Sequence, residues 1–108
     1  MKRLEIPESF LINGVKWMVY LEAEVPRVLK DKLKPGDMGV CCYSYRSIIL
    51  ASWLSEDELE ETFIHEVLHA MLEEDDMLGP GLEHHVIETL EAPLTRLLRQ
   101  LVYKEITH

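Results

Sequence analysis

The chain has 108 residues, of which 47% are hydrophobic, and a formal net charge of −9. A chain of this length holds one hydrophobic core, so we expect a single domain spanning residues 1–108. The acidic charge argues against a nucleic-acid partner, because a phosphate-binding surface needs clustered Lys and Arg. No segment approaches the roughly 20 apolar residues of a membrane span, and the N-terminus has no apolar signal peptide. We therefore expect a cytoplasmic protein with no membrane partner.

The beginning of the chain predicts a β-hairpin. Asn13-Gly14 lies between two apolar segments, and both residues tolerate the positive φ that a tight hairpin turn requires. This pattern places strands near residues 8–12 and 15–22. Residues 26–34 have the apolar spacing of a short helix, which the following Pro-Gly-Asp sequence would end.

Residues 39–52 are rich in strand-forming side chains. They predict two strands or one long bent strand, with a sheet edge just before the first long helix. Cys41 and Cys42 are adjacent and would point to opposite faces of a strand, which suits neither a disulfide nor a metal site. We expect both to be reduced structural thiols.

The back half of the chain predicts two long helices. Ser55 and Glu58 have the spacing of a capping box, so the first helix should begin at Glu56. We expect its acidic end, residues 73–76, to be solvated, and the Gly-Pro-Gly sequence at 79–81 to form a turn. The fold class is therefore α+β, with a small antiparallel or mixed N-terminal sheet packed on two helices.

The second helix should span about residues 82–103. Pro93 lies in its middle and should kink or divide it. Its expected core-facing residues share a near-heptad spacing: Val86, Leu90, Leu94, Leu97 and Leu101.

The chemistry of the first helix centres on His65, Glu66 and His69. Residues i and i+4 lie one above the other on a helix, so His65 and His69 can direct two imidazoles at one Zn²⁺ ion. Glu66 stands beside that point without having to bind the metal, where a general base would act on a water molecule. Both histidines fall in a narrow polar stripe with Thr62 and Glu73. An apolar arc occupies the rest of the helix: Leu59, Phe63, Ile64, Val67, Leu68, Ala70, Met71 and Leu72.

The third metal ligand should come from the second helix. Glu83 projects on the same side as the expected core residues, where a carboxylate needs compensation such as a bound metal ion. His84 is a borderline alternative. His85 and Glu88 project toward solvent.

Residues 62–70, TFIHEVLHA, followed by a Gly-rich turn and a helix that carries Glu83, resemble the gluzincin zinc metallopeptidases. The closest likeness is to minimal single-domain forms, such as ImmA/IrrE-like or phage-encoded relatives. The resemblance implies zinc ligation by His65, His69 and Glu83, with Glu66 as the general base. SprT-like proteins are the second choice, and they would place His84 or His85 on the zinc.

The expected function is hydrolysis of peptide bonds by a zinc-bound water and Glu66, with a peptide or protein as substrate. We expect the substrate to pair in extended form with residues 48–53. One alternative is a zinc-binding interaction module without catalysis. Another is a metal-free helical protein that packs a partner on the leucines of its second helix.

Overall fold

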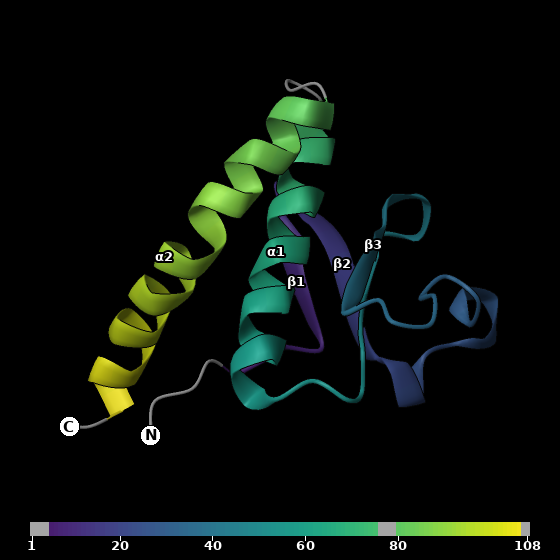
Figure 1. Ribbon diagram of the computed structural model, residues 1–108, viewed down its shortest axis with the longest axis horizontal. Coiled ribbons are helices and arrows are strands. Elements are labelled where there is room, and N and C mark those ends of the chain that lie inside the picture. Colours follow the sequence, from purple (N-terminus) through teal and green to yellow (C-terminus); the bar gives the residue numbers. More distant parts are fainter. Residues whose placement is uncertain (1–4, 76–79, 107–108) are drawn as a thin grey trace.

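The computed structural model describes the backbone of residues 5–75 and 80–106, and the side chains of residues 5–73 and 82–100. The fold is α+β, with a four-stranded mixed sheet followed by two helices (Figure 1). This architecture confirms the predicted fold class. None of the described helices is long and apolar enough to cross a membrane.

The predicted hairpin is present. β1 (Ser9–Ile12) and β2 (Val15–Leu21) pair in antiparallel register around the turn at Asn13 and Gly14. Both turn residues have positive φ, 49° at Asn13 and 79° at Gly14. The local sequence therefore determines this turn, because few residue pairs adopt these angles without strain.

The remaining strands form an antiparallel pair, β3 (Gly39–Cys42) and β4 (Ser47–Leu50). The strand order is β1-β2-β4-β3, and β2 pairs with β4 in parallel. β4 is thus an interior strand with both edges occupied. The prediction of a free sheet edge just before the first helix, with substrate pairing along residues 48–53, is therefore wrong. The open edge on this side of the sheet belongs to β3.

Between β2 and β3 the chain forms only short 3-10 turns, η1 (Glu22–Glu24) and η2 (Arg27–Leu29). The helix expected over residues 26–34 is wrong beyond this single turn. A third turn, η3 (Tyr43–Tyr45), joins β3 to β4. Cys41 and Cys42 are free thiols, as predicted.

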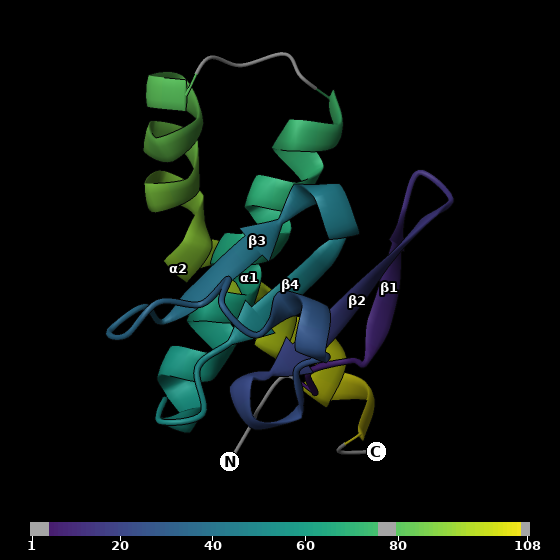
Figure 2. The ribbon, with the colours of Figure 1, turned by 90° about the vertical axis from the view of Figure 1, so that its right-hand side faces the viewer.

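α1 (Glu56–Asp75) begins at the predicted residue. The amide of Glu58 donates to Ser55 Oγ, and Glu58 Oε1 accepts from the amide of Ser55, which completes the capping box. The predicted apolar arc is buried or half-buried except at Met71, which is 48% exposed. α1 lies against β3 and β4, and Figure 2 shows β3 crossing in front of it.

α2 (Pro80–Ile106) is one helix and is not divided at Pro93. The turn predicted at 79–81 is wrong for Pro80 and Gly81, which belong to α2, and Gly79 lies outside the described residues. The predicted core face is partly wrong, because Leu90 and Leu97 are exposed whereas Ile87 is fully buried. α2 packs mainly on α1 rather than on the sheet, so its buried face is the one that contains Ile87 and Leu94. The side chain of Leu101 is outside the described residues.

The molecule therefore has three layers, in the order sheet, α1 and α2 (Figure 1). The core between the sheet and α1 contains Trp17, Ile48, Leu50 and Ile64. α1 is covered on one side by the sheet and on another by α2, and the two histidines of its polar stripe contact the second helix.

Candidate active site

Side-chain hydrogen bonds and ion pairs connect α1 to α2. His65 Nδ1 lies 2.5 Å from Glu91 Oε2, and His69 Nδ1 lies 2.6 Å from Glu83 Oε1. Farther along, Arg99 Nε donates to the buried carboxylate of Glu60. In these pairs the residue numbers rise along α1 as they fall along α2, so the two helices run antiparallel. The histidines of the α1 polar stripe therefore meet acidic side chains of α2.

The two histidine contacts determine the protonation of the rings. An ionised carboxylate can only accept a hydrogen bond, so Nδ1 of each histidine donates to its glutamate. In a neutral imidazole this leaves the lone pair on Nε2. A metal-binding histidine typically has its other ring nitrogen held in this way by a carboxylate. With the proton on Nδ1, the neutral rings of His65 and His69 would have Nε2 free for zinc ligation.

The rings are also suitably spaced. The ring centres of His65 and His69 are 4.9 Å apart. Two imidazoles on one tetrahedral zinc, with bonds of about 2.0–2.1 Å, have ring centres about 5 Å apart. The ring of His84 lies 5.3 Å from that of His69, so it has a comparable spacing on the other side.

Glu83, the predicted third zinc ligand, does not lie where a third ligand would have to be. Its contact with His69 is shorter than the roughly 3.3 Å that separates two ligand atoms of a tetrahedral zinc. It also lies at Nδ1, across the ring from Nε2. In this conformation Glu83 orients His69, and it cannot at the same time reach an ion bound at Nε2 of the same ring.

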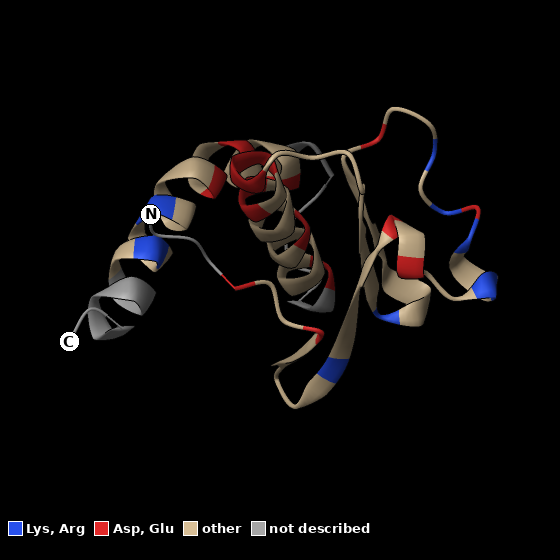
Figure 3. Cartoon of the chain, turned by 90° about the horizontal axis from the view of Figure 1, so that it is seen from below, with Lys and Arg blue, Asp and Glu red and all other residues tan. Residues whose placement is uncertain are grey.

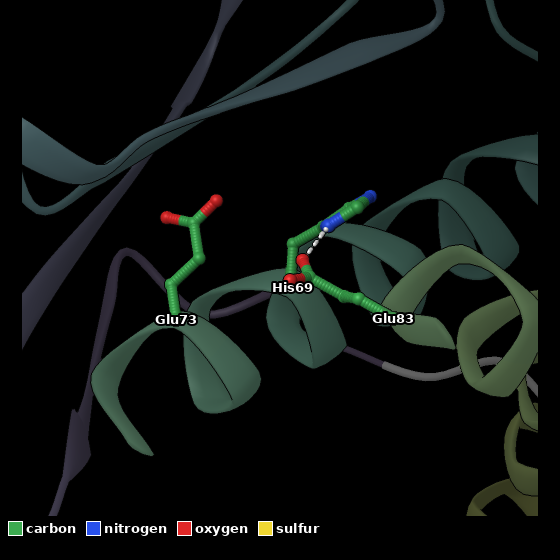
Figure 4. Close-up of side chains that lie close together, drawn as sticks. All are labelled: His69, Glu73 and Glu83. Carbon is green, nitrogen blue, oxygen red and sulfur yellow. Dashed lines mark hydrogen bonds and ion pairs between the residues drawn. The ribbon is translucent and has the colours of Figure 1, made fainter. Parts of the chain in front are cut away.

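A second possible set of metal ligands shares residues with the first. His69, Glu73 and Glu83 have ligand atoms that all lie within 4.8 Å of one another, and His65 is outside this group (Figure 4). Glu73 is half-buried there, which corrects the expectation that it belongs to a solvated helix end. Burial raises its pKa, and the neighbouring Glu83 carboxylate raises it further.

Glu66 lines a cleft on the other side of His65. The cleft has a volume of about 390 Å³ and includes His65, Thr62, Gly39 and Glu91. The side chain of Glu66 is 6% exposed, and no hydrogen-bond donor reaches it from the described residues. Burial raises the pKa of Glu66 to about 7. His65 opposes this shift, while Glu73, Asp37 and Glu91 add to it.

β3 passes directly over this carboxylate. A Cβ atom at Gly39 would lie 2.7 Å from Thr62 Cγ2 and 3.3 Å from Glu66 Oε2. The same face of β3 carries Cys41, whose pKa is raised by burial and by the nearby carboxylates of Glu73 and Glu66. This thiol is therefore held in its neutral form, which does not favour metal ligation.

The open edge of β3 is next to the cleft. The amide of Ala51 donates to the carbonyl of Met38, so these two residues form a hydrogen-bonded pair. From there, non-hydrogen-bonded and hydrogen-bonded pairs alternate along β3 and β4. In an antiparallel pair the residues between hydrogen-bonded positions turn their backbone groups outward. Gly39 and Cys41 therefore present their N–H and C=O groups at the open edge, beside Glu66.

The structure thus brings His65, Glu66 and His69 together on one helix and places Glu83 at His69. His84, His85 and Glu88 are all exposed, and of these only His84 lies beside the site. Sequence reasoning missed Glu91. Helical geometry alone does not find it, because one turn back from His69 to His65 corresponds to one turn forward from Glu83, at Ile87, whereas Glu91 lies about two turns forward.

Comparisons with protein-family models, with curated proteins and with solved structures found no match for this chain. The functional interpretation of the candidate site therefore rests on the geometry and chemistry of its residues.

Proposed function

We propose that this protein is a zinc-dependent peptidase in which His65 and His69 bind the metal and Glu66 is the general base. One observation carries the proposal: two histidines on α1 are held at Nδ1 by two carboxylates of α2, while a buried glutamate between them in sequence faces a cleft. Neutral imidazoles and carboxylates are the ligand types that zinc prefers, so the donor set fits this ion.

Zinc bound here would supply a Lewis acid and an activated water. The protein supplies the proton transfer. Glu66 has a pKa raised to about 7, so near neutral pH its carboxylate can take a proton and then return it to a leaving amine. Its burial holds the carboxylate away from bulk solvent, and Gly39 lets β3 lie against it with no side chain between them.

A peptide would bind as an added strand on β3. The outward backbone groups of Gly39 and Cys41 offer hydrogen bonds to an extended chain, which is the usual basis of strand addition. Because Gly39 lies against Glu66, a peptide paired with Gly39 would have its backbone near this carboxylate. β3 thus takes the role that the sequence analysis gave to residues 48–53.

Zinc content tests the metal site. We expect one zinc per chain in the wild type and a large loss in His65→Ala, with His85→Ala as the exposed control on α2. Zinc content near zero in the wild type, or unchanged in His65→Ala, would show that the metal assignment is wrong.

Cleavage tests the general base. Glu66→Gln retains the size of the side chain but cannot take a proton, so cleavage of unstructured peptides should fall by at least ~10² with zinc content unchanged. Equal cleavage by this variant and the wild type would overturn the role of Glu66.

Two further variants, Glu83→Ala and His84→Ala, distinguish the two candidates for the third zinc ligand. The resemblance predicts Glu83, which must leave His69 to bind the metal, and the alternative is His84, whose ring already has suitable spacing. Glu83→Ala should remove zinc as fully as His65→Ala if Glu83 is a ligand, but weaken binding only about 10–100-fold if it orients His69. In the second case His84→Ala should cause the larger loss.

A zinc-binding module without catalysis is the second candidate. It is favoured by the group of His69, Glu73 and Glu83, because these residues do not line the cleft that contains Glu66. In that case Glu73→Gln should release the metal, His65→Ala should not, and no peptide should be cleaved.

A further inference from the structure

The cleft beside Glu66 has a one-sided charge. Five of its nine lining residues are acidic: Asp37, Glu58, Glu61, Glu66 and Glu91. Neither Lys nor Arg occurs among the described residues that line it. Figure 3 shows the same asymmetry, with acidic positions along α1 and basic positions mainly between β2 and β3 and toward the C-terminal part of α2.

Three of these acids have hydrogen-bond partners in the protein, and two are open to a ligand. Asp37 Oδ2 accepts from the amide of Lys34. Glu58 caps α1, and Glu91 contacts His65. No hydrogen bond or ion pair engages Glu61 or Glu66 within the described part of the chain. Glu66 in particular is more than nine-tenths buried and lines the cleft, and no hydrogen-bond donor among the described residues engages its carboxylate. A buried carboxylate without a partner is costly unless a ligand compensates it.

The open edge of β3 determines where such a ligand would lie. A strand added at Gly39 and Cys41 would run along the cleft, and its alternate side chains would point toward α1. A side chain entering there would meet Asp37 and Glu61 at the rim and Glu66 below.

We propose that the substrate is a peptide with a single basic side chain, Arg or Lys, that enters this acidic cleft next to the scissile bond. The inference depends on the proposed peptidase function and names its substrate class. Opposite charges at such a rim raise affinity and association rate, and salt screens both effects.

The other end of β3 limits the positive charge of the peptide. Lys32 lies over the ring of Tyr45, and Arg46 lies over the ring of Tyr43, with centroid distances of 5.7 and 5.5 Å. Two cations therefore lie near this end of β3, whereas carboxylates line the cleft at Gly39. A peptide with basic residues along its whole length would be repelled at this end, so one basic residue near Gly39 should bind better than a polycation.

Peptide binding measured without metal separates recognition from hydrolysis. Dye-labelled extended peptides that differ only in one central residue, Arg, Gln or Glu, would be titrated with chelator-treated wild type by fluorescence anisotropy. We expect the Arg peptide to bind about tenfold more tightly than the Glu peptide at low salt, and the difference to shrink at high salt. A peptide of consecutive Arg residues should bind less tightly than the single-Arg peptide.

Glu61 provides the specific variant, because it is exposed on α1 and lines the cleft. Glu61→Gln should reduce the preference for Arg, and Glu61→Lys should remove or reverse it. Glu24→Gln removes the same charge from the exposed η1 turn, away from the cleft, and should leave the preference unchanged. Equal binding of the three peptides, or an equal effect of Glu24→Gln, overturns the inference.

The two proposals fail in different ways. If zinc-loaded protein cleaves Arg, Gln and Glu peptides at equal rates, the charge preference is wrong and the peptidase remains. If the Arg peptide binds preferentially but none of the peptides is cleaved, the peptidase is wrong and the cleft is a binding site for a basic peptide.

Discussion

Gly39 in β3 lies so close to Glu66 in α1 that a Cβ atom at residue 39 would be 3.3 Å from Glu66 Oε2. The edge strand and the candidate general base are therefore placed by direct contact between a sheet and a helix. A side chain at residue 39 would separate these two elements or move the carboxylate, which explains why glycine suits this position.

Gly39→Ala should lower the free energy of unfolding. Its added methyl group would lie 2.7 Å from Thr62 Cγ2 and 3.2 Å from the Ile49 carbonyl oxygen. Such overpacking typically costs about 1–3 kcal/mol, measurable by urea denaturation. Thr62→Ser in the same chain removes the contacting methyl group and should restore part of the loss. An Ala variant as stable as the wild type would show that β3 can move away from α1.

Glu66 should make the metal-free protein less stable as pH rises. Its pKa is 4.5 in an ordinary environment and about 7 in the fold, so the folded state favours the neutral carboxyl. The resulting stabilisation is fully present below pH 4.5 and is lost as pH rises through 7. The shift corresponds to about 3 kcal/mol.

Glu66→Gln isolates this effect, because glutamine does not titrate. Measured in the presence of a chelator, the variant should gain stability relative to wild type between pH 4.5 and 7 and keep a constant advantage above that range. Contributions from carboxyl groups that do not interact with Glu66 appear in both proteins and cancel. A pH-independent difference between the two proteins would contradict the buried position of Glu66.

Glu91→Gln should weaken zinc binding without abolishing it. Glu91 holds His65 at Nδ1, and loss of such a partner typically costs 10–100-fold in metal affinity. Glu88→Gln, on an exposed position of the same helix, is the matched control and should have no effect. Competition with a chromophoric zinc chelator measures both. A loss as complete as that of His65→Ala would instead make Glu91 a ligand.

Arg99→Met should destabilise the contact between α1 and α2. Arg99 donates to Glu60, whose side chain is 2% exposed, so the substitution removes a cation that compensates a buried carboxylate. The expected loss is about 3 kcal/mol in urea denaturation at neutral pH. Glu60→Gln combined with Arg99→Met removes both charges and should recover part of that loss. Equal stability of the single and double variants would contradict this explanation.

The sequence by itself determined the local elements whose signals lie within a few residues. The Asn13-Gly14 turn requires positive φ, and the Ser55 and Glu58 capping box satisfies the first amides of a helix, so both were predictable at residue level. The spacing of His65, Glu66 and His69 likewise follows from helical geometry alone. These features depend on neighbours along the chain and not on distant contacts.

Only the tertiary structure decided which distant elements meet. Strand order is not encoded in the pattern of any one strand, so β4 proved interior and β3 became the edge beside Glu66. The partners of the histidines depend on the register of two packed helices, which brings Glu91 to His65 and Glu83 to His69. A helical projection shows the direction of a side chain but not what it faces, because the facing residue belongs to another element and is chosen by packing of the whole core.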